Sequence, residues 1–175
     1  MEFVFLIIII LIIGVTVYFF IDTKKTTIEE AEYTPVFKDK NLQKKMLRNA
    51  QICAESVMTS FDKVLNYTSE SIRVLDEVIN TLYKKKGISN ASKDKLVLTF
   101  GSYFGQTFIN NHTGMWFEHP NFKLPIIFAP RALFEFSPFE IMDKKFQYVE
   151  EFDLYIAYED LIKQYFKRMR DMQLT

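Results

Sequence analysis

The apolar run over residues 3–21 constrains the structure of this 175-residue chain more than any other segment. It reads FVFLIIIILIIGVTVYFFI and contains no charged side chain. A helix of this length, at about 1.5 Å per residue, crosses the roughly 30 Å hydrocarbon core of a lipid bilayer. Lipid offers the backbone no hydrogen-bond partners, so such a segment is expected to be helical. The sequence therefore predicts a transmembrane helix over residues 3–21.

A cleaved signal peptide is the main alternative for this run. Signal peptides begin with a positively charged stretch and end in small residues at the cleavage site. Here Met1 and Glu2 precede the run, and the bulky residues 18–21 close it. An uncleaved anchor is therefore the favoured interpretation. A helix buried within protein is disfavoured, because one small domain could not cover every face of so apolar a helix.

The flanking charges predict how the anchor is oriented. Lys24 and Lys25 directly follow the run, and nothing basic precedes it except the amino terminus. Positive residues stay on the cytoplasmic side, so the C-terminal part is expected in the cytoplasm. Cys53 is the only cysteine, which excludes an internal disulfide and fits a reducing compartment.

Two segments follow the anchor. Residues 22–39 are polar and unpatterned, which is typical of a juxtamembrane linker, although Tyr33, Val36 and Phe37 leave open an extended arm packed on the domain. Residues 40–175 are long enough for one folded domain and too short for two. The chain has 22 Lys and Arg against 22 Asp and Glu. This balance gives no basic character that would indicate a nucleic-acid partner.

Apolar side chains recur at three-and-four spacing in three consecutive stretches of the domain. The predicted helices cover residues 41–62, 68–86 and 91–112. Thr68 is the expected N-cap of the second helix, and Gly87 is its expected end.

Beyond Gly114 the pattern changes to short apolar runs that indicate strands. The predicted strands cover residues 115–117, 124–128 and 131–136 and form a small antiparallel meander. Ser137 followed by Pro138 and Glu140 is typical of a helix start, and a last helix is expected from near Asp153. The predicted fold is α+β: an N-terminal transmembrane helix, then one small domain of about five helices packed on a short antiparallel sheet of about three strands.

Gly101 and Gly105 lie four residues apart inside the predicted helix 91–112. Each costs the helix about 1 kcal/mol relative to alanine, so a compensating gain is expected. The two glycines leave a patch of the helix surface without side chains, which we call the bare patch. It would allow a tight crossing with another helix or the sheet, or it would bind a ligand. The segment is no phosphate-binding loop, since no strand, glycine-rich turn and Lys-Ser/Thr pair accompany it.

Several ordered stretches of the domain match a known sequence pattern. They are NYTSESI with LDEVI (66–72 and 75–79), GSYFGQ with GMW (101–106 and 114–116), LPI (124–126) and, loosely, SPFEIMDKKF (137–146). Over about residues 66–166 the chain resembles a widespread group of uncharacterised bacterial proteins with the patterns DYSPESLxxLDxLL and GAYLGEVxxxxxGGxW, a proline-centred strand and an xPxxxVxKR helix. The resemblance implies a shared fold and a bacterial origin, and no established activity comes with it. Gln106 stands where the group has Glu, which weakens any role that needs that carboxylate.

The chain offers few groups for catalysis or metal binding. His112 and His119 are its only histidines, and a zinc site would need two further ligands. Cys53 lies on the apolar stripe of the predicted helix 41–62, where a small buried residue is expected instead of a nucleophile. We therefore predict no catalytic residue, metal or cofactor and expect that the protein is not an enzyme.

An aromatic group with polar edges is the part of the sequence most like a binding site. It comprises Trp116, Phe117, His119 and Phe122. Such groups often form partner surfaces, although aromatic residues of strands more often belong to the core. The candidate interaction or pocket residues are Gly101, Gly105, Gln106, His112, Trp116, Phe117, His119 and Phe122.

Two functional hypotheses follow. The preferred one is a single-pass protein of the bacterial inner membrane whose cytoplasmic domain binds another protein, as an immunity-like protein or an envelope accessory protein would. The other is a small membrane-tethered enzyme or ligand sensor with a pocket between helix 91–112 and the sheet. Gln106, Asn110, His112 or Glu118 would line that pocket. The basic C-terminal stretch 163–170 is either a solvated helix end or a contact with anionic lipid headgroups.

Overall fold

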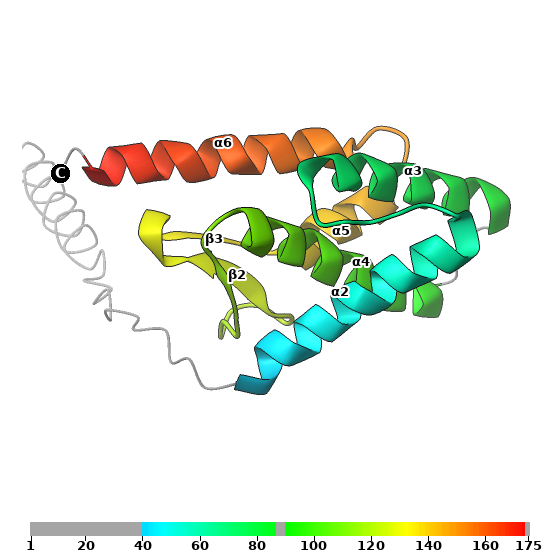
Figure 1. Ribbon diagram of the computed structural model, residues 1–175, viewed down its shortest axis with the longest axis horizontal. Coiled ribbons are helices and arrows are strands. Elements are labelled where there is room, and N and C mark those ends of the chain that lie inside the picture. The colour runs from blue at the N-terminus through cyan, green and yellow to red at the C-terminus, as the bar shows by residue number, and fades with distance from the viewer. Residues whose placement is uncertain (1–39, 87–89, 174–175) are drawn as a thin grey trace, which may run out of the picture. The chain divides into compact units, whose positions relative to one another are not determined.

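The computed structural model describes residues 40–86 and 90–173 (Figure 1). The chain divides into two units, Met1–Val36 and Phe37–Thr175, and the described residues belong to the second. The predicted transmembrane helix 3–21 and the linker 22–39 lie outside the described residues. Within the described ranges, no helix combines the length and the apolar character that a membrane crossing requires.

The described residues form an α+β domain, as predicted. The helices are α2 (Lys40–Phe61), α3 (Ser69–Lys86), α4 (Asn90–Asn111), α5 (Pro138–Gln147) and α6 (Leu154–Gln173), and the strands are β1 (Met115–Phe117), β2 (Ile126–Ala129) and β3 (Phe134–Phe136). The strands form one antiparallel sheet in the order β1-β2-β3, with Trp116 opposite Ile127 and Ala129 opposite Phe134. The predicted meander is therefore confirmed.

Local side-chain chemistry sets three of the helix starts. The Thr68 hydroxyl accepts a hydrogen bond from the Ser71 N–H at 3.3 Å, and the Ser137 hydroxyl accepts one from the Glu140 N–H at 3.2 Å. A carboxylate oxygen of Asp153 accepts from the Ile156 N–H at 2.9 Å. Each cap satisfies a backbone donor that the helix itself leaves free and contributes about 1 kcal/mol.

Two predicted strands begin later than expected. The strand predicted over residues 124–128 is β2, which begins at Ile126. Residues 131–136 were predicted as a strand, but Pro130–Ala132 form a short 3-10 helix, η1, and β3 begins only at Phe134. Proline fixes its own φ near −65°, which suits such a turn. Leu133 ends the turn in the left-handed region, at φ 43° and ψ 46°, which costs a bulky side chain on the order of 1 kcal/mol.

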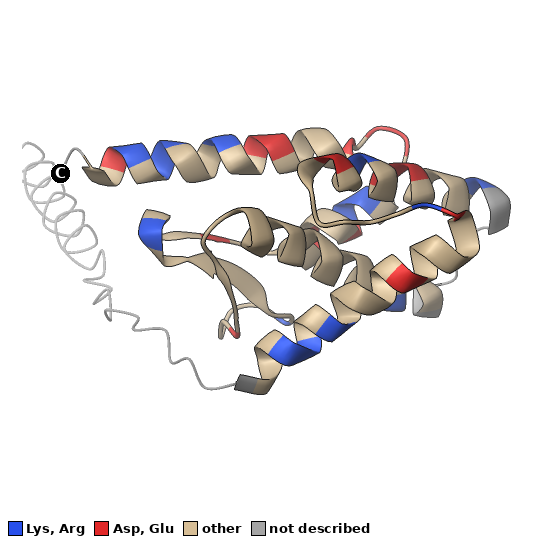
Figure 2. Ribbon diagram, viewed as in Figure 1, with Lys and Arg blue, Asp and Glu red and all other residues tan. Residues whose placement is uncertain are grey.

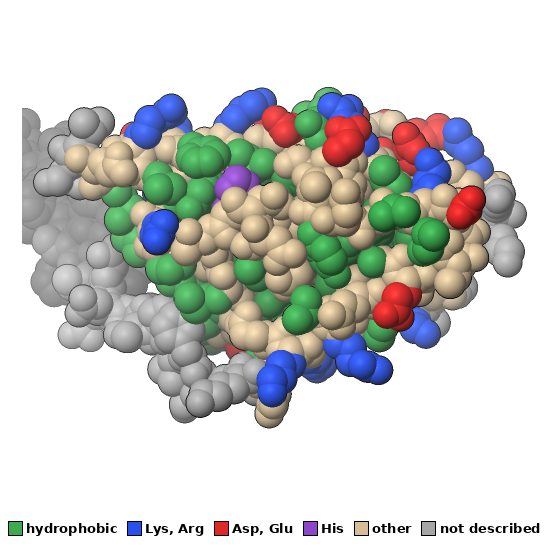
Figure 3. All heavy atoms as spheres, viewed as in Figure 1, with side chains coloured by type: hydrophobic (Ala, Val, Ile, Leu, Met, Phe, Trp, Pro, Cys, Tyr) green, Lys and Arg blue, Asp and Glu red, His purple; other side chains and the backbone are tan. Residues whose placement is uncertain are grey.

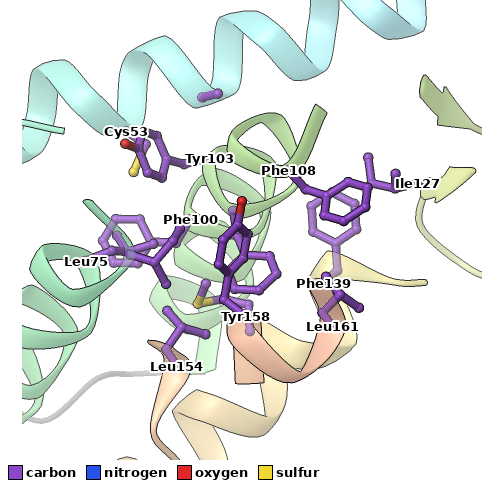
Figure 4. Close-up of a cluster of buried hydrophobic side chains, with 14 of the residues drawn as sticks. Cys53, Leu75, Phe100, Tyr103, Phe108, Ile127, Phe139, Leu154, Tyr158 and Leu161 are labelled. Atoms are coloured by element: carbon purple, nitrogen blue, oxygen red, sulfur yellow. The ribbon is translucent and has the colours of Figure 1, made fainter. Parts of the chain in front are cut away.

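Helix α4 lies at the centre of the domain. Every residue from 101 to 108 is buried. Helix α2 packs along one side of α4 and α5 along another, whereas α3 packs mainly on α6. Figure 4 shows how Phe100, Tyr103 and Phe108 of α4 meet side chains of the other helices and the sheet. The ring of Phe104 contacts that of Tyr158 on α6 edge to face, with centroids 5.3 Å apart.

Candidate functional site

Aromatic side chains fill the bare patch at the two α4 glycines. A Cβ atom on Gly105 would lie 2.4 Å from the Cη2 atom of Trp116, and one on Gly101 would lie 2.6 Å from the Cδ1 atom of Phe139. Both rings are buried, and their centroids are 5.7 Å apart. The patch is therefore a tight contact of α4 with the sheet and α5, and no room is left at either glycine for a ligand.

Gln106 holds the Trp116 indole in place. The Trp116 Nε1–H donates to the Oε1 atom of Gln106 at 3.3 Å, and the Gln106 amide donates to Asn110 at 2.8 Å. The side-chain amide of Gln43 on α2 makes two hydrogen bonds to the backbone of the same tryptophan. It donates one to the carbonyl oxygen at 2.6 Å and accepts one from the N–H at 3.2 Å. Trp116 and Gln106 thus belong to the interior of the domain.

His112 lies among aromatic rings of α4 and α6. Its ring centroid is 4.9 Å from that of Phe108, 5.5 Å from Tyr165 and 5.6 Å from Phe166. Its Nε2 atom is buried without a hydrogen-bond partner among the described residues. Burial disfavours the charged imidazolium and lowers the pKa of His112 below its ordinary value.

The three other candidate residues, Phe117, His119 and Phe122, lie close together at the connection between β1 and β2. The ring of Phe117 lies 5.9 Å from His119, and His119 lies 5.1 Å from Phe122, both measured between centroids. We call these three residues the loop cluster. Residues 118–120 and 122–125 of the connection also line an open hollow of about 450 Å³.

A second hollow of about 450 Å³ shares Phe122, Lys123 and Leu124 with the first. It lies between the N-terminal half of α4, the β1–β2 connection and α5, and we call it the α4–α5 hollow. Its apolar lining comprises Val97, Leu98, Phe122, Leu124 and Phe139, and its carboxylates are those of Asp94, Glu140 and Asp143. The hollow is therefore an apolar surface with three carboxylates and one lysine, Lys123, around it.

The charges of the α4–α5 hollow are only partly paired. The Lys93 ammonium group lies 2.7 Å from a carboxylate oxygen of Asp143. Among the described residues no ion pair engages Asp94 or Glu140. Such a surface suits a cationic side chain with an aliphatic stem, whose carbon atoms can cover the apolar floor while the charge reaches the carboxylates.

Only Phe122 of the eight predicted residues lines the α4–α5 hollow. The pocket predicted between helix 91–112 and the sheet was expected to be lined by residues such as Gln106 and His112. Neither of these two residues lines the α4–α5 hollow. The sequence analysis missed the carboxylates of the site. One local signal was present: Glu140 and Asp143 are three residues apart in a predicted helix and therefore lie on one face.

The described residues hold no group of three or more His, Cys, Asp and Glu side chains placed to bind a metal ion. Cys53 is fully buried on α2, and this burial strongly raises the pKa of its thiol. The thiolate is the reactive form of cysteine, so this side chain is inert at neutral pH.

Comparison of the chain with protein-family models, with curated proteins and with solved structures finds no match. The resemblance to the bacterial group accordingly stays a prediction.

Proposed function

We propose that residues 40–175 form a non-catalytic protein-binding domain, which the apolar segment 3–21 anchors in a bacterial inner membrane with the domain in the cytoplasm. The partner is another protein that docks on the loop cluster and the α4–α5 hollow. An immunity-like protein that neutralises a toxin, or an envelope accessory protein, needs only these two features: an anchor and a complementary surface.

The α4–α5 hollow is the observation that carries this proposal. Protein interfaces are anchored by a few apolar or aromatic side chains in a pocket, with polar groups at the rim. The hollow offers an apolar floor next to the half-buried ring of Phe122 and the exposed side chain of Leu124. The carboxylates of Asp94 and Glu140, which no ion pair within residues 40–86 and 90–173 engages, favour a partner segment that presents lysine or arginine among apolar residues.

Site-specific photocrosslinking in living bacteria tests the proposal. A photoreactive amino acid replaces Lys123 at the hollow in the full chain, and in a matched control it replaces Lys84, an exposed lysine of α3 outside the hollow. We expect position 123, and not position 84, to crosslink to one dominant protein. The additional change Leu124→Asp should abolish that crosslink. Equal crosslinking from both positions, or none from position 123, would contradict the proposal.

The volume of the α4–α5 hollow favours one second candidate, a sensor of a small cationic amphipathic ligand. Pockets for small molecules begin at roughly 300 Å³, so the hollow is large enough. Native mass spectrometry of the purified full chain distinguishes the two functions. A discrete small molecule that co-purifies with the protein, and is lost in an Asp94→Asn, Glu140→Gln variant, would favour the sensor.

A further inference from the structure

One end of the domain brings together two segments that are distant in the sequence. The η1 turn and the last turns of α6 both lie towards the left in Figure 1. The η1 turn packs against α6. The ring of Phe134, next to this turn, lies 6.3 Å from that of Tyr165 on α6, measured between centroids. We call this region the η1–α6 end.

Large apolar side chains are exposed at the η1–α6 end. The exposed fractions are 65% for Leu133, 46% for Phe166 and 42% for Met172. Figure 3 shows hydrophobic side chains gathered where α6 passes the sheet, with a histidine among them. An exposed apolar surface that is continuous across several elements is typical of an interaction site.

Leu133 is unfavourable at its position in two independent ways. Its backbone adopts the left-handed region, where glycine or asparagine would be accommodated more easily. Its side chain is directed into solvent, where it gains nothing from burial. The exposed side chain of Leu133 would gain free energy if an apolar environment covered the turn.

Basic side chains accompany this apolar surface on both elements. Figure 2 shows Lys and Arg on η1 and along the C-terminal half of α6. They are Arg131, Lys167, Arg168 and Arg170, all exposed. None of them takes part in an ion pair within residues 40–86 and 90–173. Asp171 is the exposed acidic residue on these two segments, and Glu135 of the following strand β3 is also exposed.

We propose that the η1–α6 end is a docking site for an anionic lipid bilayer. Leu133 and Phe166 enter the interfacial layer, and the accompanying basic side chains contact acidic headgroups. Apolar side chains flanked by basic ones are the combination that binds a protein to an anionic membrane surface. This inference rests on the membrane anchor of the proposed function and is independent of the protein partner at the α4–α5 hollow.

The length of the chain that precedes the domain supports this occupant. Residues 22–39 connect the apolar run 3–21 to α2, and a chain of this length reaches at most about 60 Å. The domain is thus held close to the bilayer, so docking is intramolecular and needs only weak attraction.

Lipid quenching of a fluorophore on the full chain tests the proposal. The full chain is reconstituted into vesicles of phosphatidylcholine, with or without phosphatidylglycerol. An environment-sensitive fluorophore is attached to Leu133→Cys or, as the matched control, to Ile156→Cys, which is 58% exposed at the other end of α6. Cys53 is buried and does not compete for the label. We expect spin-labelled lipid to quench the fluorophore at position 133 and not at position 156, and only in the anionic vesicles.

The charge dependence provides a second measurement. Removing one basic side chain near a membrane surface weakens its attraction about fivefold, so the double variant Arg168→Gln, Arg170→Gln should abolish the difference in quenching between positions 133 and 156. High salt should do the same. Equal quenching at both positions would overturn the docking proposal while leaving the anchor intact. Release of the wild-type chain from vesicles by alkaline carbonate would instead overturn the anchor, and the docking with it.

Discussion

The ammonium group of Lys145 lies 2.9 Å from the Oδ1 atom of Asp76, and it joins α5 to α3 inside the domain. The side chain of Lys145 is only 1% exposed. Its two other hydrogen bonds go to the carbonyl oxygens of Val149 at 2.5 Å and Phe152 at 2.8 Å. Asp76 also accepts from the N–H of Leu154, the first residue of α6, at 3.2 Å. One buried ion pair therefore fixes α3, α5, α6 and the connection between the last two helices.

Lys145→Met is expected to destabilise the domain by about 3 kcal/mol, because it leaves the Asp76 carboxylate largely buried without its cation. The measurement is urea unfolding of the full chain in detergent, followed by the fluorescence of Trp116, the single tryptophan. The double variant Lys145→Met, Asp76→Leu should recover part of the loss. Lys163→Met, which removes an exposed partner of Asp160, is the matched control and should leave the urea midpoint unchanged. A wild-type midpoint for Lys145→Met would contradict the structural role of the pair.

Gly105→Ala is expected to lower the free energy of unfolding by about 1 to 3 kcal/mol, although alanine is the better helix former. The new methyl group would meet the Trp116 ring at 2.4 Å and the Cγ atom of Pro138 at 2.9 Å. The indole must therefore move, and its emission spectrum should shift. Lys95→Ala, at an exposed position of the same helix, is the control and should cause no destabilisation of this size. An increase in stability for Gly105→Ala would show that the contact is looser than described.

Gln43→Ala is expected to destabilise the domain by about 1 kcal/mol, because the backbone N–H and C=O of Trp116 each lose a partner. The amide of Gln43 occupies the free edge of β1, where it hydrogen-bonds as a neighbouring strand would. Amide hydrogen exchange of Trp116 should accelerate in the variant. Exchange as slow as in Gln51→Ala, at an exposed position of α2, would refute this role.

The stability of the domain is expected to fall as the pH decreases from about 7.5 to about 5.5, because the unfolded chain binds a proton at His112 more readily than the folded one. Burial lowers the pKa of His112 in the folded protein below its ordinary value of 6.5, so protonation in this window favours unfolding. His112→Phe should remove that slope, since a phenyl ring fits among Phe108, Tyr165 and Phe166 and does not titrate. The measurement is thermal unfolding of the wild-type protein and of the His112→Phe variant across this pH range. An unchanged slope in His112→Phe would assign the effect to other groups.

The helix starts could be predicted from the sequence because their causes are local. Thr68 and Ser137 cap helices with groups a few residues away, and the structure shows both caps. The prediction of a strand over residues 131–136 was wrong in its first half because the cause of the turn there is not local. The apolar pattern of this segment favours a strand, but the turn at Pro130 and the left-handed backbone of Leu133 are fixed by packing of η1 against α6.

The candidate site shows where sequence reasoning stops. The spacing of Gly101 and Gly105 predicted a close contact, but nothing local indicates that Trp116 and Phe139 fill it. The α4–α5 hollow combines Asp94 and Asp143, which lie on different helices far apart in the chain. A single sequence contains no information on which distant side chains meet, so the hollow emerges only from the structure.

The pairing of Asp76 with Lys145 has a consequence for biosynthesis. The ribosome makes α3 early, yet both the lysine that pairs with its aspartate and the helix α6 that packs on α3 follow about 70 residues or more later. Translation at roughly 5 to 20 residues per second leaves the apolar face of α3 uncovered for several seconds. We therefore expect the nascent chain to expose this apolar face to chaperones until α6 has been made and has packed on α3.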